Sequence, residues 1–205
     1  MKNILSLLTL SLLLGLWSCG PAQQAEEATE ETNTEEVAAE ETATAGMSGE
    51  NFEITVIKDG IASPRKEMKG TVGGVEVTVN YGSPSVKGRT IWGDLVMFND
   101  VWRTGANETT TIEFSADVMV EGQELAAGKY GLFTFPTAES VIVIFSTKTE
   151  GWGSGDYAEA DDALRVTVTP NAVEESAEML DFVVEGDAVV LQWADWKVPF
   201  TVAAK

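Results

Sequence analysis

Short segments in which apolar and polar residues alternate recur from Phe52 to the end of the chain, and this period of two constrains the fold more than any other feature. In one segment, for example, Val75, Val77 and Val79 alternate with polar residues. Strict alternation is typical of a β-strand with one buried face. The sequence therefore predicts strands at 52–57, 75–81, 109–114, 117–122, 129–135, 141–146, 164–169, 179–186, 188–193 and 196–203.

About ten short strands with turn residues between them, and at most one short helix near residues 157–163, are typical of an antiparallel β-sandwich, and we expect a jelly-roll-like one. The run at 141–146 is apolar on both faces, which predicts a strand inside a sheet. Pro199 predicts an edge position or a bulge in the last strand. Ala194-Asp195 predicts a turn, and we expect the flanking Trp193 and Trp196 in the core.

The first 18 residues have the pattern of a secretory signal peptide, because Lys2 is followed by an apolar run and then by the small residue Ser18. Cys19 is the sole cysteine of the chain, which excludes a disulfide within it. Its position after LWS resembles the lipobox of bacterial lipoproteins. We therefore predict that Cys19 is lipidated and attaches the protein to a membrane. The alternative is an ordinary signal peptide followed by a free thiol.

Residues 19–50 form a second region, in which positions 20–50 contain nine glutamates and no Lys or Arg. This region has too few large apolar groups to offset the entropy of ordering a chain. We predict that it is a disordered acidic tether, followed by one β-sandwich domain at 51–205. The alternative is an export signal like those in surface lipoproteins of Bacteroidetes-type bacteria.

Composition excludes several classes of function. The formal net charge is −20 at pH 7, so we expect no nucleic-acid partner. The chain has no histidine, which excludes serine–histidine and cysteine–histidine catalysis and histidine metal sites. No glycine-rich phosphate loop precedes a helix, and we expect no cofactor. Asp156, Asp161 and Asp162 lack the spacing of a calcium loop, so we also expect no metal.

The segment 81–107, YGSPSVKGRTIWGDLVMFNDVWRTGAN, is a long connection between two predicted strands. Connections of this length in a compact domain are usually functional or disordered. Its many aromatic and aliphatic residues argue against disorder. We interpret it as a packed loop that carries a binding surface.

Arg103, next to Trp102 and near Asn107, is the centre of the predicted site, because a guanidinium beside aromatic rings presents a planar fork to a carboxylate, a phosphate or a pair of sugar hydroxyls. Trp152 lies between glycines on a turn, where an exposed indole favours contact with a ligand. The predicted binding residues are Arg89, Trp92, Trp102, Arg103, Asn107 and Trp152. The alternatives are arginines paired with acids of the same chain and tryptophans that fill the end of the sandwich.

Two carboxylates near this loop, Asp94 and Glu108, form a weaker alternative site. Glycoside hydrolysis uses a pair of carboxyl groups as acid and base or nucleophile. The sequence does not fix their separation, and most exposed carboxylates are merely solvated.

Several motifs together resemble a known family: SPRKE (63–67), YGSPSVKGRTIWG (81–93), VWRTGANETTTIEFS (101–115), AGKYGLFTFP (127–136) and WGSGDY (152–157). They are similar to domain-of-unknown-function family 2911, which is common in Bacteroidetes-type bacteria. The resemblance covers about residues 60–202 and implies an exported all-β domain, but it implies no activity. The run Met97-Phe98-Asn99-Asp100 differs from the Pro-Tyr-Gly-like turn of many members.

These observations lead to one main hypothesis and two alternatives. We predict a lipid-anchored, non-enzymatic protein of the bacterial cell envelope, at the outer membrane, that binds a glycan, a peptidoglycan fragment or an envelope protein. The alternatives are a hydrolase of envelope carbohydrate that uses Asp94 and Glu108, and a structural subunit. The membrane face and the oligomeric state stay open.

Overall fold

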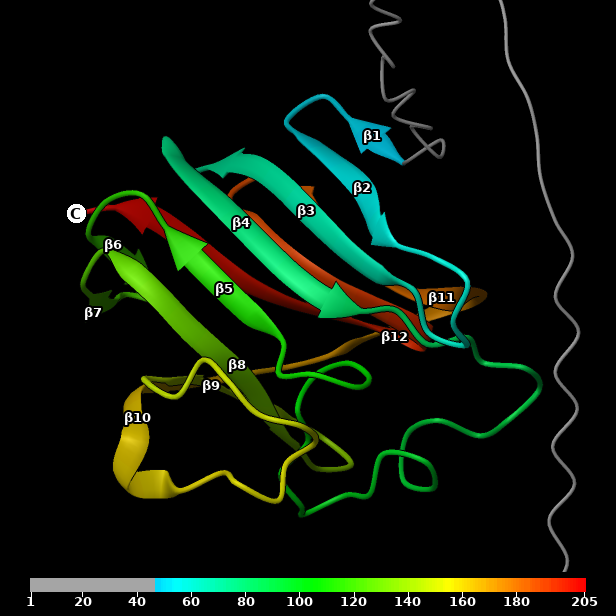
Figure 1. Ribbon diagram of the computed structural model, residues 1–205. Coiled ribbons are helices and arrows are strands. Elements are labelled where there is room, and N and C mark those ends of the chain that lie inside the picture. The colour runs from blue at the N-terminus through cyan, green and yellow to red at the C-terminus, as the bar shows by residue number, and fades with distance from the viewer. Residues whose placement is uncertain (1–46) are drawn as a thin grey trace, which may run out of the picture. The chain divides into compact units, whose positions relative to one another are not determined.

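The computed structural model describes residues 47–205, which form two antiparallel sheets (Figure 1). The large sheet contains β1 (Ser48–Gly49), β2 (Phe52–Lys58), β3 (Arg65–Val72), β4 (Val75–Gly82), β5 (Thr111–Phe114), β8 (Gly128–Pro136), β9 (Val141–Ser146) and β10 (Asp162–Val168), in this spatial order. The small sheet contains β11 (Asn171–Glu185), β12 (Ala188–Ala204), β6 (Val118–Val120) and β7 (Gln123–Leu125), in this spatial order. A 3₁₀ turn, η1 (Glu159–Asp161), precedes β10. The prediction of an all-β antiparallel two-sheet fold is confirmed.

Consecutive strands are neighbours through most of the large sheet, so its order is closer to a meander than to the paired Greek keys of a jelly roll. After β5 the chain adds β6 and β7 beside β12, and then returns to the large sheet as β8. The predicted internal strand at 141–146 is β9, which lies between β8 and β10 and is buried on both faces, as Val143 and Ile144 show.

The core lies between the two sheets, because the alternating residues of each sheet place their apolar side chains on the inner face. Tyr81 of β4 meets Phe182 of β11 with ring centroids 5.0 Å apart. Farther along, Phe145 of β9 meets Phe200 of β12 at 5.8 Å. Both pairs have the edge-on geometry that aromatic quadrupoles favour. These contacts join the sheets without a disulfide.

Strand β3 was not predicted. It pairs with β2 and β4, and its inner positions include Met68 and Val72, which are fully buried, but also Lys66. The Nζ atom of Lys66 lies 2.6 Å from Oδ1 of the buried Asp181 on β11, and the Tyr81 hydroxyl donates to the same oxygen at 2.9 Å. The alternation of apolar residues in β3 is therefore interrupted by Lys66, whose partner Asp181 is distant in the sequence.

Strand β12 runs without interruption from Ala188 to Ala204, so the predicted turn at 194–195 is wrong. Ala194 instead has a φ of 51° and lies opposite Ala177, where the register of β11 shifts on both sides. This irregularity is a β-bulge, which bends the strand without ending it. The neighbouring Trp193 is buried as predicted.

Pro199 lies in a part of β12 without a ladder partner. The pairing with β11 ends at Lys197, and the pairing with β6 begins at Val202. A proline is tolerated here because its missing N–H is not needed for a sheet hydrogen bond. This position agrees with the prediction of an edge-like site.

The strand β11 is an edge of the small sheet, and residues 84–86 cover part of that edge. The backbone N–H of Val86 donates to the carbonyl oxygen of Glu178 at 2.7 Å. The N–H of Leu180 donates to the carbonyl oxygen of Pro84 at 3.0 Å. The connection after β4 therefore covers residues 178–180 on the open side of β11.

Strand β1 begins at Ser48, within the region predicted as a tether (19–50), so the sheet starts earlier in the chain than the predicted domain start at 51. The predicted signal peptide and Cys19 lie outside the described residues. Between positions 47 and 205, no helix is long and apolar enough to cross a bilayer.

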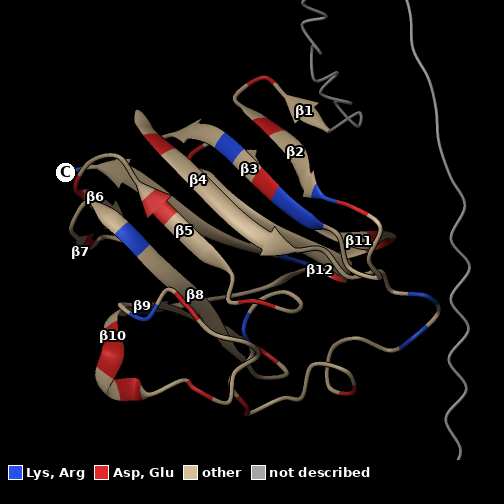
Figure 2. Cartoon of the chain, viewed as in Figure 1, with Lys and Arg blue, Asp and Glu red and all other residues tan. Residues whose placement is uncertain are grey.

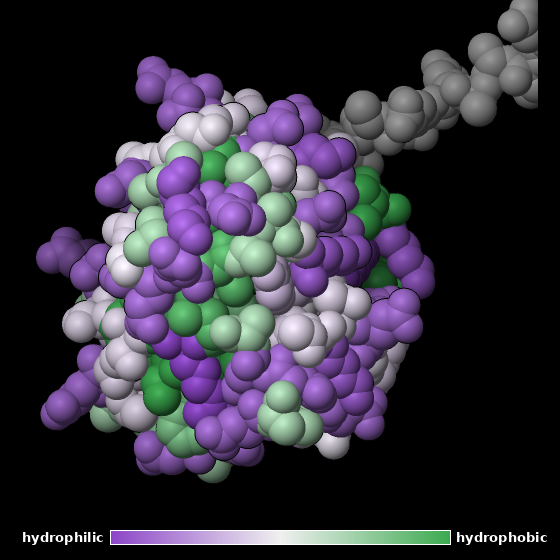
Figure 3. Space-filling view, turned by 90° about the vertical axis from the view of Figure 1, so that its left-hand side faces the viewer, coloured by the Kyte–Doolittle hydropathy of each residue, from purple (hydrophilic) through white to green (hydrophobic). Residues whose placement is uncertain are grey.

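Acidic residues are spread over the strands and loops of the domain, and basic residues are fewer (Figure 2). On the face seen in Figure 3, hydrophilic residues cover most of the surface and hydrophobic residues form a narrow, interrupted strip.

Candidate functional site

The connection between β4 and β5, residues 83–110 (the crossover), lies at one end of the sandwich (Figure 1). Two backbone hydrogen bonds of 2.8 Å join Trp102 to Thr134 of β8. On its other side, the N–H of Gly153 donates to the carbonyl oxygen of Asn107 at 3.1 Å. The crossover is thus a packed loop whose backbone is held by neighbouring strands and turns.

Indoles anchor the crossover to β12. Trp92 stacks on Trp196, with centroids 4.7 Å apart, and Trp102 stacks on Trp193 at 5.7 Å. The indole N–H of Trp92 also donates to the carbonyl oxygen of Trp193 at 3.3 Å. Trp92 and Trp102 therefore fill the end of the sandwich, which was the structural alternative for these residues, and Trp102 in addition reaches a cavity.

The turn from Thr104 to Asn107 has an unusual backbone. Thr104 has a φ of 54° and Asn107 a φ of 66°, which is a region that β-branched residues rarely adopt. The turn is tight, since a Cβ on Gly105 would lie 2.6 Å from Oγ1 of Thr110. That hydroxyl donates to the Thr104 carbonyl oxygen at 3.1 Å. Backbone strain of this kind is concentrated at functional sites.

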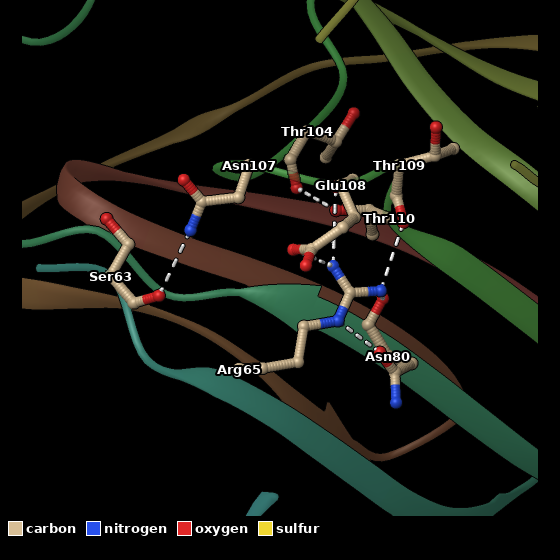
Figure 4. A network of polar contacts seen from close by, with 8 residues as sticks. All are labelled: Ser63, Arg65, Asn80, Thr104, Asn107, Glu108, Thr109 and Thr110. Carbon is tan, nitrogen blue, oxygen red and sulfur yellow. Dashed lines mark hydrogen bonds and ion pairs between the residues drawn. The ribbon is translucent and has the colours of Figure 1, made fainter. Parts of the chain in front are cut away.

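Arg65 of β3 holds the end of this turn (Figure 4). Its guanidinium donates to the carbonyl oxygens of Asn80, Thr109 and Glu108 at 3.1, 3.0 and 3.3 Å, and Nε donates to the side-chain oxygen of Asn80. The Glu108 carboxylate lies 3.8 Å away. Burial lowers the pKa of Arg65, and the charge of Glu108 opposes this shift. The alternative role predicted for Arg103 and Arg89, an arginine that fixes the loop beside an acid of the same chain, is thus filled by Arg65, which was not among the predicted residues.

A cavity of about 420 Å³ lies beside the turn. Its volume is within the range of small-molecule sites, roughly 300–1,000 Å³. The wall combines residues 62–63, residues of the crossover and Trp193 of β12. Three basic residues line it, namely Lys87, Arg89 and Arg103, and no Asp or Glu is among the lining residues.

Arg103 differs from Arg65 because it has no acid beside it. Its Nε–H is buried and has no hydrogen-bond partner among the described residues. Burial lowers the pKa of Arg103, with no opposing carboxylate. A guanidinium stays charged under ordinary conditions, so this site holds a partly desolvated cation without a counter-charge from residues 47–205.

Two other predicted residues line the cavity but are partly engaged in the fold. Arg89 donates from Nε to the Val86 carbonyl oxygen at 3.0 Å and from Nη2 to the Ser85 carbonyl oxygen. The side-chain N–H of Asn107 donates to the carbonyl oxygen of Ser63 at 3.3 Å. The structure thus brings Arg89, Trp102, Arg103 and Asn107 together on one wall.

The remaining predicted residues lie outside the cavity wall. Trp152 is 68% exposed on the turn that is hydrogen-bonded to Asn107, next to the site but not in it. Asp94 is exposed on the crossover, and Glu108 faces Arg65. Neither carboxylate lines the cavity. Across residues 47–205 there is no cluster of Asp, Glu, His or Cys that fits a metal ion.

Sequence reasoning missed Lys87 and Trp193, which also line the cavity, and Arg65, which orients the turn. Lys87 could have been predicted, because it lies two residues before the predicted binding residue Arg89 in the run Lys87-Gly88-Arg89. Trp193 is far from the crossover in sequence, and only its stacking on Trp102 brings it to the site.

A family model described as a protein of unknown function (DUF2911) matches residues 63–202. The match includes the crossover and the strands from β3 to β12, except the last two residues of β12. No curated protein and no solved structure matches the chain.

Proposed function

The chain belongs to the DUF2911 family of proteins of unknown function, and from this premise we propose that it is a lipid-anchored envelope protein that binds its ligand in the crossover cavity without catalysis. The ligand class is a glycan or a peptidoglycan fragment. Arg103 is the centre of the site, with Trp102 and Asn107 beside it and Arg89 at its rim.

The observation that carries this proposal is the buried Nε–H of Arg103, which has no hydrogen-bond partner within residues 47–205. A buried donor without a partner is costly, and proteins rarely keep one without a reason. Here the guanidinium lines a cavity of ligand size, where an acceptor from outside the chain completes its hydrogen bonds. A purely structural arginine would resemble Arg65, which uses its donors on backbone carbonyl oxygens.

The cavity wall supports binding rather than hydrolysis. Glycoside hydrolysis requires two carboxyl groups on opposite sides of the scissile bond. No carboxylate lines the cavity, and Glu108 is directed to Arg65 (Figure 4). The residues that do line it donate hydrogen bonds or offer apolar surface, which is the composition of a recognition site.

The test is binding of soluble saccharides and peptidoglycan fragments to the full chain, purified in detergent and measured by titration calorimetry. We expect Arg103→Ala to weaken binding at least tenfold while the melting temperature falls little, because the Arg103 side chain forms no ion pair with the described residues and its buried Nε–H has no hydrogen-bond partner there. Lys58→Ala is the matched control, since Lys58 is an exposed cation that does not line the cavity. A large fall in melting temperature of Arg103→Ala, with no binding by the unmodified chain, would show that Arg103 is structural.

Membrane attachment through Cys19 is a separate part of the proposal. It rests on the sequence pattern of residues 1–19. We expect Cys19→Ala to move the protein from the membrane fraction to the soluble fraction of cells. Continued fractionation of this variant with membranes would refute the lipid anchor and leave the binding site untouched.

A further inference from the structure

The charge of the cavity wall is opposite to that of the chain. The chain has a formal net charge of −20, whereas the charged residues on the wall are all basic. Lys87, Arg89 and Arg103 form no ion pair within the described part of the chain. By contrast, Arg65, Lys66 and Arg165 each have an acidic partner. A cavity whose charged lining residues are three unpaired cations, in a protein that is otherwise acidic, presents a selective site for an anion.

A second observation points to an acceptor. Among residues 47–205, the buried indole N–H of Trp193 has no hydrogen-bond partner, and neither has the buried Nε–H of Arg103. Both residues line the same cavity. Two N–H donors of this kind are complementary to the oxygens of an anion.

From this we infer that the ligand is an acidic saccharide, whose carboxylate is bound by Arg103 and by the indole N–H of Trp193. The inference rests on the proposed function and specifies its ligand. Among the wall cations, Arg103 is partly buried, whereas Lys87 and Arg89 are exposed. One interior cation balances a single negative charge, which favours a carboxylate over a doubly charged phosphate.

The rest of the wall suits a sugar ring. The half-buried indole of Trp102, together with Leu95 and Val96, offers apolar surface to the C–H face of a ring. Asn107 uses its amide N–H on Ser63, which leaves its side-chain oxygen as an acceptor for a hydroxyl. Lys87 and Arg89 at the rim raise the local concentration of anions.

The experiment compares four probes on the full chain in detergent by calorimetric titration at low salt: a uronic-acid disaccharide, its methyl ester, the neutral parent disaccharide and inorganic phosphate. We expect the acid to bind at least tenfold more tightly than the ester or the neutral sugar, and its affinity to fall as salt is raised. Arg103→Gln should abolish this preference. Trp193→Phe, which keeps an aromatic ring and removes the N–H, should reduce it, while Lys58→Ala should leave it unchanged.

The outcomes separate the inference from the proposed function. Equal affinity for the acid, the ester and the neutral sugar would overturn the carboxylate site and leave a saccharide-binding protein. Preference for phosphate over all sugars would overturn the acidic-saccharide assignment. Binding of none of the saccharides, with a folded protein shown by its melting transition, would overturn both. If Trp193→Phe does not fold, Arg103→Gln alone decides the role of the carboxylate.

Discussion

Gly82 and Ala106 are in direct backbone contact: a Cβ on Gly82 would lie 2.1 Å from the carbonyl oxygen of Ala106, and the Ala106 N–H donates to the Gly82 carbonyl oxygen at 3.2 Å. Through this contact the end of β4 packs directly against the turn that follows Arg103. The two motifs YGSP and WRTGAN are thus the two sides of one packing contact, and each supplies a glycine to it.

Gly82→Ala should therefore destabilise the domain. The added methyl group has no space, because its obstacle is backbone rather than a flexible side chain. We expect a loss of about 1–3 kcal/mol in the free energy of unfolding, measured by denaturant titration. Gly155→Ala is the control, since no atom lies within 4 Å of its Cβ position. Equal stability of the two variants would show that the contact is not tight in solution.

Arg65→Met should also destabilise the domain, because it leaves the buried carbonyl oxygens of Asn80 and Thr109 without their charged donor. We expect a loss of roughly 2–3 kcal/mol. Glu108→Gln should cost less than about 1 kcal/mol, because the Glu108 side chain is 44% exposed and its ion pair is screened by water. Chemical denaturation of both variants checks the order. A larger loss for Glu108→Gln would mean that the ion pair, rather than the backbone contacts, holds the turn.

Asp181→Asn should be among the most destabilising polar substitutions, because it leaves the Lys66 ammonium between the sheets without a negative partner. Breaking one side of a buried pair costs about 3–5 kcal/mol. The control is Glu67→Gln on the same strand, which removes the pair of half-buried Glu67 with exposed Lys69 and should cost under about 1 kcal/mol. Thermal unfolding of both variants tests the difference, and similar small losses would contradict the role of Asp181.

Tyr81→Phe should make stability less sensitive to alkaline pH. Burial, followed by the charge of Asp181, raises the pKa of Tyr81 above its ordinary value of 10.0. The unfolded chain therefore loses this proton at a lower pH than the folded protein does. The stabilising contribution is complete below pH 10.0 and is lost as the pH rises above that value. The free energy of unfolding, measured from pH 8 to 11, should thus fall less steeply for Tyr81→Phe than for the control Tyr157→Phe, which replaces a half-buried tyrosine and keeps Tyr81. Parallel curves for the two variants would refute this.

The sequence predicted most of the fold because most strands have one apolar face. The prediction failed where a polar residue on the inner face of a strand is stabilised by a partner from the other sheet. The alternation of β3 is interrupted by Lys66, whose partner Asp181 is on the other sheet. It also failed at Ala194-Asp195, which was predicted to be a turn: Ala194 adopts a left-handed conformation inside a strand, where the register of the opposite strand shifts.

The candidate site was predicted in part. Aromatic residues around Arg103 indicated a packed loop, and the structure places Trp102, Arg89 and Asn107 with it on one cavity wall. The sequence left open whether Arg103 binds a ligand or fixes the loop by pairing with an acid of the same chain. The answer depends on Arg65, which is remote in sequence and reaches the loop only because β3 and β4 are paired.

The crossover both lines the cavity and covers part of the edge of β11, so the shape of the cavity and the resistance of the protein to aggregation depend on the same segment. Pro84 both lines the cavity and accepts a hydrogen bond from Leu180 on the open side of β11. Any change that displaces this residue would reshape the cavity and at the same time expose unpaired backbone groups, onto which a second molecule can add its own strand. Such a variant would then lose ligand binding and would also self-associate into aggregates.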